Sequence, residues 1–185
     1  MEVVIDSARL FSRLERIRQH WQANKDDLYS GADALCVPMG SAKEQEGVYS
    51  KASSIHLYLL NYEFPDSLIL LVGSKLYFMA TAKKNSYIEA AAAENKNGSI
   101  EIITLLKSKE EDANREQFRV LFKAIKGAGN KLGTLLKHDA AGRFIQQWNE
   151  MVKSSGCELV DIARGLGMLL AVKDEVELVN IPFLT

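Results

Sequence analysis

Apolar residues recur at helical spacing in several stretches of the chain, and each such stretch predicts an amphipathic helix. The first helix follows a capping residue, Asp6 or Ser7, and its apolar face consists of Leu10, Leu14, Ile17 and Trp21. Later stretches predict helices over residues 53–60, 86–94, 114–126, 140–155 and 162–172. The last of these is weakened by Gly165 and Gly167, because glycine is a poor helix former.

Residues with strong capping or helix-breaking tendencies set the expected helix boundaries. Ser53 is expected to open the second helix and Pro65 to end it. Asn114, with Gln117 three residues later, has the spacing of a capping box, and Gly127 is expected to stop that helix. The next helix is expected to begin at Asp139 and to stop at Gly156, with a buried face of Phe144, Ile145, Trp148, Met151 and Val152.

Short apolar runs bounded by turn residues alternate with the helices and predict β-strands. They cover residues 33–37, 67–72, 75–80, 100–106, 131–136 and 158–160. Gly73-Ser74 joins the second and third runs as a tight hairpin, and it is the only break in the alternation of strand and helix. The pattern predicts one α/β domain, with a mixed sheet of about six strands and helices on both faces.

Composition narrows the class of protein without indicating a chemistry. The 185 residues are 47% hydrophobic and carry a formal net charge of -1, which excludes a disordered chain and gives no bulk attraction to nucleic acid or anionic membrane. No run approaches the roughly 20 apolar residues of a membrane span, and we expect no signal peptide. Cys36 and Cys157 are too far apart in sequence to suggest a metal-binding pair, and both are expected to be reduced.

The residues that usually carry catalysis do not assemble into a recognisable motif. His20, His56 and His138 are widely separated, and His56 has the surroundings of a hydrogen-bonded packing residue rather than a metal ligand. The glycines between residues 127 and 133 follow a helix and precede a strand, the reverse of a phosphate-binding loop. The basic positions of the first helix, Arg9, Arg13, Arg16 and Arg18, are expected to form a solvated face. We therefore expect no cofactor and no metal.

An ordered series of motifs resembles one protein family. Residues 58–67 read Y-L-L-N-Y-E-F-P-D-S and resemble the family signature W-L-F-G-Y-E-F-P-D-T, with Asn61 in place of its glycine. Residues 77–84 read Y-F-M-A-T-A-K-K and resemble I-F-M-A-S-x-K-K, and further matches follow at 103–106, 144–149 and 171–178. The sequence is thereby identified as resembling the N-terminal region of the large subunit of the FACT histone chaperone.

The resemblance implies a fold, a function and a set of partners. It implies the small N-terminal lobe of an aminopeptidase P or creatinase fold over residues 1–172, with 173–185 as a linker toward a second lobe. Because the metal ligands of the peptidases lie in that second lobe, the resemblance implies a non-catalytic role. It implies a nuclear, chromatin-associated module that binds histones, H3–H4 in particular, during nucleosome reorganisation in transcription, replication and repair. The HMG-box subunit of FACT is expected to bind other parts of the full-length protein, and neither membrane nor direct nucleic-acid binding is expected.

The motif residues also supply a candidate interaction surface, for which simpler roles stay open. That surface consists of Tyr62, Glu63, Asp66, Lys83 and Lys84. The first three can equally serve to close a helix and open the hairpin, and the two lysines can lie in a solvated turn. Carboxylates suited to basic histones are Glu44, Glu46, Glu110, Glu111 and Asp112. Two alternatives to the chaperone role are the accessory lobe of an active aminopeptidase P-like metalloenzyme and a purely structural lobe.

Overall fold

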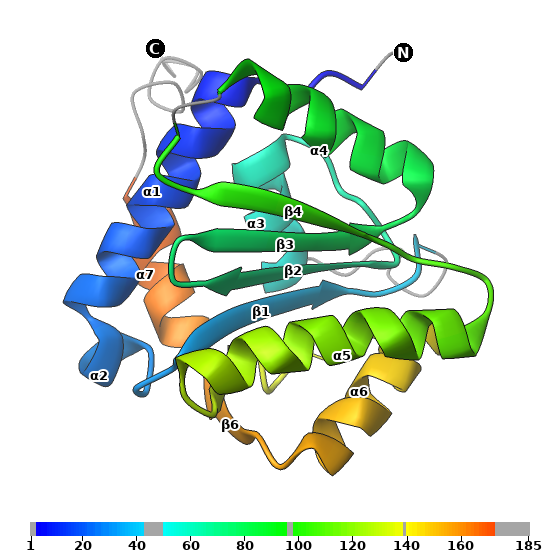
Figure 1. Ribbon diagram of the computed structural model, residues 1–185. Helices are drawn as coiled ribbons and strands as arrows, with labels where there is room; N and C mark the ends of the chain where they lie inside the picture. Colours follow the sequence, from blue (N-terminus) through cyan, green and yellow to red (C-terminus); the bar gives the residue numbers. More distant parts are fainter. Residues whose placement is uncertain (1–2, 43–49, 96–97, 139, 173–185) are drawn as a thin grey trace.

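The computed structural model describes residues 3–42, 50–95, 98–138 and 140–172, which form a sheet with helices on both sides (Figure 1). The elements in chain order are α1 (Ser7–Ala23), α2 (Lys25–Leu28), β1 (Ala34–Met39), α3 (Lys51–Leu60), β2 (Ser67–Val72), β3 (Lys75–Ala80), α4 (Ala82–Glu94), β4 (Glu101–Leu106), α5 (Glu111–Ala128), β5 (Lys131–Thr134), α6 (Arg143–Ser155), β6 (Glu158–Asp161) and α7 (Ala163–Ala171). Within these residues no helix is both long enough and apolar enough to cross a membrane.

The six strands lie in the order β4-β3-β2-β1-β5-β6, and the sheet is mixed. Strand β2 is antiparallel to both β1 and β3, whereas the pairs β1–β5, β3–β4 and β5–β6 are parallel. The hairpin between β2 and β3 turns at Gly73, whose φ of 56° is the conformation that glycine adopts without strain. The predicted fold class, a mixed α/β sheet of about six strands, is confirmed.

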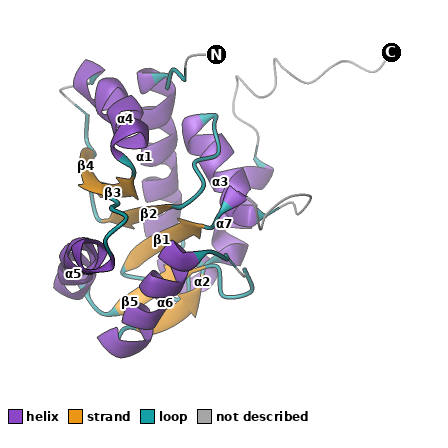
Figure 2. Cartoon of the chain, turned by 90° about the vertical axis from the view of Figure 1, so that its right-hand side faces the viewer, coloured by secondary structure: helices purple, strands orange, loops and turns teal. Residues whose placement is uncertain are grey.

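Two helical layers cover the sheet, and Figure 2 shows them on opposite sides of the strands. One layer, which we call the four-helix layer, consists of α1, α3, α4 and α7. The other consists of α5 and α6. Successive side chains of the central strands point to opposite faces and so pack against both layers. Leu35 and Val37 of β1 pack in the cluster of the four-helix layer, whereas Ala34 and Cys36 pack in the cluster of α5 and α6. Cys36 is therefore fully buried, as its apolar sequence context predicts.

Three helices begin earlier than the sequence predicted. Helix α3 starts at Lys51, because the Oγ atom of Ser50 accepts a hydrogen bond from the backbone N–H of Ser53. Helix α4 starts at Ala82 instead of residue 86. Helix α5 starts at Glu111, so Asn114 lies inside its first turns and is not the predicted capping residue.

The helix ends and one strand also differ from the sequence prediction. Helix α3 ends at Leu60, five residues before Pro65, because Asn61 adopts a left-handed conformation with φ 59°. Asparagine tolerates this conformation better than most residues, which explains how it replaces the glycine of the family motif. Helix α5 passes Gly127 and ends at Ala128, β5 ends at Thr134, and α6 begins at Arg143. The predicted capping residue Asp139 lies outside the described residues.

The basic face predicted for the first helix is only partly solvated. Arg13 is 3% exposed, and its guanidinium carbon lies 4.4 Å from the centre of the Tyr58 ring in α3. Its Nη1 atom donates a hydrogen bond to the carbonyl oxygen of Tyr58. Arg13 therefore belongs to the contact between α1 and α3, where a planar cation can stack on an aromatic face and keep a hydrogen-bond acceptor.

Candidate interaction site

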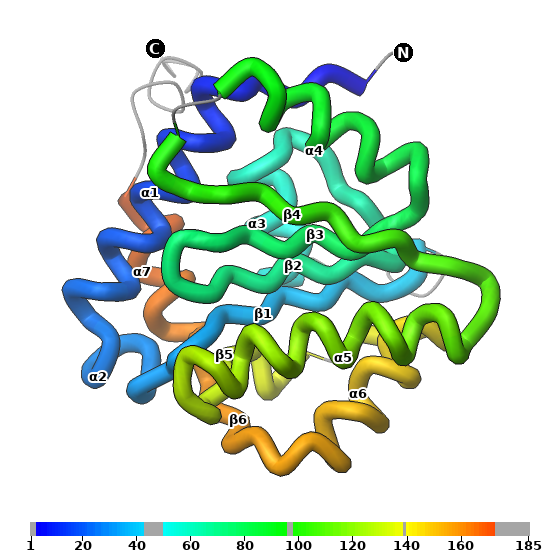
Figure 3. Tube along the Cα trace, viewed as in Figure 1, coloured from blue at the N-terminus to red at the C-terminus, as the bar shows by residue number. Residues whose placement is uncertain are grey.

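The candidate site lies at the end of the sheet where the parallel strands have their carboxyl termini, which we call the carboxyl edge. Strands β1, β3 and β4 terminate there, on the right-hand side of Figures 1 and 3, and β2 begins there, whereas β5 runs in the same direction as β1 and stops partway along it. Loops from distant parts of the sequence therefore meet at one place, as ligand-binding loops do in open α/β sheets. Among the motif residues, this geometry places Asp66 before β2 and Lys84 in the first turns of α4.

A pocket of about 360 Å³ opens among these loops and the amino ends of α5 and α6. Its polar lining residues include Ser41, Asp66, Lys107, Lys109, Asn114 and Arg143. Asp66 is held by its backbone: it has a left-handed φ of 53°, and its N–H donates to the carbonyl oxygen of Gly40 at 2.9 Å. The residue at the start of β2 is thereby fixed against the end of β1.

Lys84 is half-buried beside this pocket, and its ammonium group is held in place. Its Nζ atom donates a hydrogen bond to the carbonyl oxygen of Pro65. Burial lowers the pKa of Lys84, the carboxylate of Asp66 opposes that shift, and the ammonium of Lys107 adds to it. Asp66, Lys84 and Lys107 therefore form one electrostatically coupled cluster, drawn from two loops and the first turns of α4.

A buried amide pair forms one wall of the pocket. Asn114 of α5 is 3% exposed, and its Oδ1 atom accepts a hydrogen bond from the backbone N–H of Ser108 at 2.8 Å. Its Nδ2 atom donates to the Ser108 carbonyl at 3.1 Å and to Oε1 of Gln147 in α6 at 3.3 Å. This network fixes the loop after β4 against both helices.

The rim of the pocket carries charges of both signs. Arg143 Nε donates to Oε1 of Glu111 at 2.6 Å, and this hydrogen bond lowers the pKa of the Glu111 carboxyl. Asp112, one residue further, is 96% exposed, and Glu110 is exposed as well. The lining thus offers hydrogen-bond donors to carbonyl or carboxylate oxygens, and the rim offers carboxylates to basic side chains.

The structure brings only part of the predicted surface to this pocket. Asp66 lines it and Lys84 lies beside it, whereas Glu63 and Lys83 are exposed. Tyr62 is half-buried and stacks on Phe64 with 6.3 Å between ring centres. Phe64 is 4% exposed and contacts the rings of Phe78 and Tyr87, so this part of the motif packs the core.

Sequence reasoning did not single out Lys107, Arg143 or Asn114 as members of a site. The available signal for Lys107 was its position directly after a predicted strand, because residues at the carboxyl ends of parallel strands gather at one edge. Arg143 and Asn114 gave no such signal, since their place depends on how α5 and α6 pack together. Glu44 and Glu46, which were predicted as histone-binding carboxylates, lie outside the described residues.

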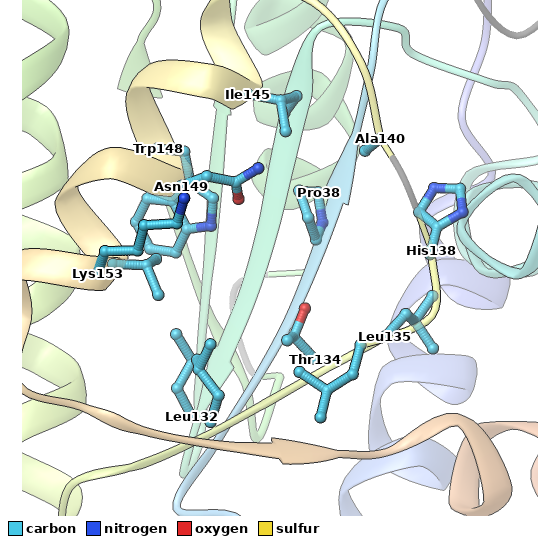
Figure 4. A pocket seen from close by; sticks show the side chains of 13 residues that line it. Pro38, Leu132, Thr134, Leu135, His138, Ala140, Ile145, Trp148, Asn149 and Lys153 are labelled. Atoms are coloured by element: carbon cyan, nitrogen blue, oxygen red, sulfur yellow. The ribbon is translucent and has the colours of Figure 1, made fainter.

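A second pocket, of about 260 Å³, lies between α6 and strands β1, β5 and β6 (Figure 4). Its walls are mostly apolar and include Pro38, Leu132, Ile145 and Trp148. The polar groups around it are those of Thr134, His138, Asn149 and Lys153. The pocket thus combines apolar walls with a few polar groups, as small-molecule pockets commonly do.

No constellation for metal-dependent catalysis appears in the part of the chain that the structure describes. Within it, no three His, Cys, Asp or Glu residues are grouped so that they could hold a metal ion. His56 is fully buried, as expected for a packing residue, and burial lowers its pKa to about 3. A backbone hydrogen bond with Val37 opposes part of that shift, as expected for a hydrogen-bonded packing residue, although neither ring nitrogen has a partner of standard geometry among the described residues.

Comparison with solved structures identifies the class of fold. A dipeptidase PepE from Mycobacterium ulcerans superimposes with a TM-score of 0.57 at 13% identity, over 95% of this chain and 40% of that one. An Xaa-Pro dipeptidase from Bacillus anthracis does so with a TM-score of 0.52 at 16% identity, over 90% of this chain and 38% of that one. At these identities the likeness concerns the fold alone. The architecture is that of a lobe found in Xaa-Pro peptidase-like proteins.

Closer relatives identify the family within that class. Residues 5–165 match the family described as FACT complex subunit SPT16 N-terminal lobe domain, and the chain belongs to this family. The N-terminal domain of FACT complex subunit SPT16 from Eremothecium gossypii superimposes with a TM-score of 0.81 at 31% identity, over 94% of this chain and 40% of that one. The corresponding chickpea domain gives 0.85 at 26% identity, over 95% and 40% of the two chains.

Sequence relatives agree with this assignment. FACT complex subunit SPT16 of Gibberella zeae is 36% identical over 183 residues, and the Arabidopsis thaliana protein of the same name is 28% identical over 184 residues. Each alignment covers 96% of this chain but 17% of the relative, so the chain spans about a sixth of their length. The resemblance inferred from the motifs is confirmed.

Proposed function

We propose that this chain is a non-catalytic interaction module of a FACT-type histone chaperone. The supporting observation is the family match over residues 5–165. In this proposal the module lies in the nucleus on chromatin and contributes to nucleosome reorganisation during transcription, replication and repair. Residues 1–172 form the lobe and 173–185 lead toward a second lobe. The HMG-box subunit of the complex binds other parts of the full-length protein.

The proposed ligand is histone H3–H4, or an extended peptide segment of it, bound at the carboxyl-edge pocket. Lysine and arginine side chains dominate the histone surface, and the exposed carboxylates of Glu110 and Asp112 at the start of α5 can pair with them. Lys107 in the lining and Arg143 at the rim can donate to carbonyl or carboxylate oxygens of the same ligand. A surface that carries both positive and negative groups can fix the orientation of the bound histone segment without a large net charge.

A calorimetric titration of this chain with H3–H4 tests the proposal, with the other core-histone pair titrated in parallel. We expect binding to H3–H4 that weakens as salt rises, because exposed ion pairs are screened. The double variant Glu110→Lys, Asp112→Lys is expected to weaken binding roughly tenfold. Its matched control is Glu116→Lys on the same helix, whose carboxylate pairs with Arg119 away from the pocket lining and should leave the affinity unchanged. Binding to neither histone pair would contradict the proposal.

The likeness to dipeptidases supports a second candidate, the accessory lobe of an active aminopeptidase P-like metalloenzyme. The full-length protein distinguishes the two candidates. Release of an N-terminal residue from an Xaa-Pro peptide, abolished by a chelator and restored by a divalent metal, would support the peptidase. Absence of that activity in metal-loaded full-length protein, together with histone binding, would support the chaperone module.

A further inference from the structure

The two edges of the sheet differ in how well they are protected against pairing with another strand. Strand β6 is four residues long and is bounded by the carboxylates of Glu158 and Asp161. The hydroxyl of Ser30 donates to the carbonyl of Asp161 at 3.2 Å, which occupies part of that edge. Short, charged or covered edges are the usual means by which proteins prevent edge-to-edge association.

Strand β4, at the other edge, lacks these protections along its length. It has six residues, no proline, and no charged side chain between Glu101 and Lys107. No described segment pairs with it on the side away from β3. Glu101 is 61% exposed and Leu106 is 53% exposed, so both ends of the strand are accessible.

The backbone groups that β4 leaves unpaired can be assigned from its hydrogen bonds to β3. The N–H of Glu101 donates to Ser74 and that of Lys107 donates to Ala80, so odd-numbered residues face β3. Because successive residues of a strand direct their backbone groups to opposite sides, Ile102, Thr104 and Leu106 present theirs outward. These three alternate residues can therefore form backbone hydrogen bonds with a further strand.

The sequence of this edge is complementary to itself when reversed. From residue 101 to residue 107 it reads E-I-I-T-L-L-K. Laid antiparallel on a second copy with Thr104 opposite Thr104, Ile102 lies opposite Leu106 and Ile103 opposite Leu105. Glu101 then lies opposite Lys107 at both ends. The outward-facing residues fall opposite one another in this register, as hydrogen-bonded antiparallel pairs require.

We propose that β4 pairs antiparallel with β4 of a second copy of this chain, about a two-fold axis that passes beside Thr104. The sheet then continues from one copy into the other, with two apolar pairs on each side of the axis and two opposite-charge pairs at its ends. Cross-strand pairs of both kinds stabilise antiparallel sheets. The interface is of the self-complementary kind that forms most homodimers. The other edge does not share this property, since reversing Glu-Leu-Val-Asp sets Glu158 opposite Asp161.

Sedimentation equilibrium over a range of concentrations is the first test. One added strand pair buries little area, so we expect a weak dimer with a dissociation constant in the micromolar range, on the order of 10–100 µM. A chain that stays monomeric up to about 0.5 mM, well above that range, would overturn the proposal.

Charge exchange tests the register. Glu101→Lys places like charges opposite each other at both ends and should weaken dimerisation on the order of tenfold. Adding Lys107→Glu in the same chain restores opposite charges and should restore the affinity. Glu158→Lys on β6 is the matched control and should leave it unchanged. Failure of the double variant to recover, with far-ultraviolet circular dichroism unchanged, would overturn the proposed register.

A cysteine at the two-fold position gives an independent readout. Hydrogen-bonded antiparallel residues lie about 5.5 Å apart between Cα atoms, within the range that a disulfide spans. Thr104→Cys is therefore expected to form a covalent dimer under mild oxidation. The background carries Cys157→Ser, because Cys157 is partly exposed whereas Cys36 is buried. The control is Glu158→Cys in the same background, and equal cross-linking at both edges would contradict the proposal.

Discussion

The two helical layers stabilise the same sheet by different means. The four-helix layer buries Arg13 and His56 among aliphatic and aromatic residues. The layer of α5 and α6 also buries aromatic rings, among which Phe122 stacks on Trp148 with 4.9 Å between ring centres, but among the described residues it buries no Arg, Lys, His, Asp or Glu side chain. Its buried polar groups include the neutral amides of Asn114 and Gln147. We therefore expect the four-helix layer to make the free energy of unfolding depend on pH. We expect the packed rings of the other layer to make it depend on side-chain size.

The largest effect is expected from truncating the centre of the aromatic cluster. Trp148 is 2% exposed and contacts Phe118 as well as Phe122. Trp148→Ala should lower the free energy of unfolding by about 3–5 kcal/mol, because it removes buried area and leaves a cavity. Urea unfolding measures the change. Met168→Ala, at a side chain of α7 that is 54% exposed, is the control and should change stability by less than about 0.5 kcal/mol.

Shape also matters at one point of the four-helix layer, and two glycines of α7 provide a matched pair. A Cβ atom added at Gly165 would lie 2.6 Å from the fully buried ring of Tyr29, whereas one added at Gly167 would meet no atom within 4 Å. Gly165→Ala should therefore destabilise by about 1–3 kcal/mol. Gly167→Ala should stabilise by about 0.5–1 kcal/mol through helix propensity. Thermal unfolding compares them, and equal effects would contradict the packing of α7 on Tyr29.

The pH dependence distinguishes the layers most directly. Burial lowers the pKa of His56 to about 3, and the nearby ammonium of Lys84 adds to the shift. In the unfolded chain this histidine titrates near its ordinary value of about 6.5, so between these values the unfolded state binds the extra proton. Stability should thus be full above about pH 6.5 and fall by up to about 1.4 kcal/mol for each pH unit below it.

Urea unfolding between pH 7 and pH 5 measures this slope. His56→Gln removes the titrating ring and should flatten the slope contributed by this residue, whatever its effect on stability at pH 7. Trp148→Phe, in the other layer, should keep the slope of the parent chain. A slope that is unchanged in His56→Gln would show that other groups produce it.

The smallest effect concerns helix capping, which differs between individual helices; α4 and α7 of the four-helix layer also lack a side-chain cap bond. Asp6 and Ser50 cap α1 and α3 with side-chain hydrogen bonds, whereas neither Glu110 nor Gly142 makes a side-chain cap bond for α5 or α6. Ser50→Ala should cost about 1 kcal/mol. Glu110→Ala should cost less than half of that in the same chemical denaturation experiment. The reverse ranking would contradict the assigned start of α3.

Local pattern was sufficient for the order of the strands and of the longer helices and for the class of fold, but it did not predict the short helix α2. The hairpin at Gly73 and the amphipathic faces of α1, α5 and α6 are short-range properties of the sequence, and the structure contains all of them. The candidate site was harder to predict. Asp66 and Lys84 were recognised through motif resemblance, but Lys107, Arg143 and Asn114 join them only because the loops after three strands and the ends of two helices meet at one edge.

The sequence by itself determined the alternation of strand and helix, the two-sided burial of the central strands and the membership of the family, because these depend on periodicity and motif order. Only the tertiary structure decided that Arg13 is buried, that Asn114 links two helices and that Gly165 is required while Gly167 is not. Each of these depends on which atoms of a distant segment lie opposite the residue. The sequence shows the chemical type of each residue, whereas the contribution of that residue to stability depends on the neighbours that the fold places around it.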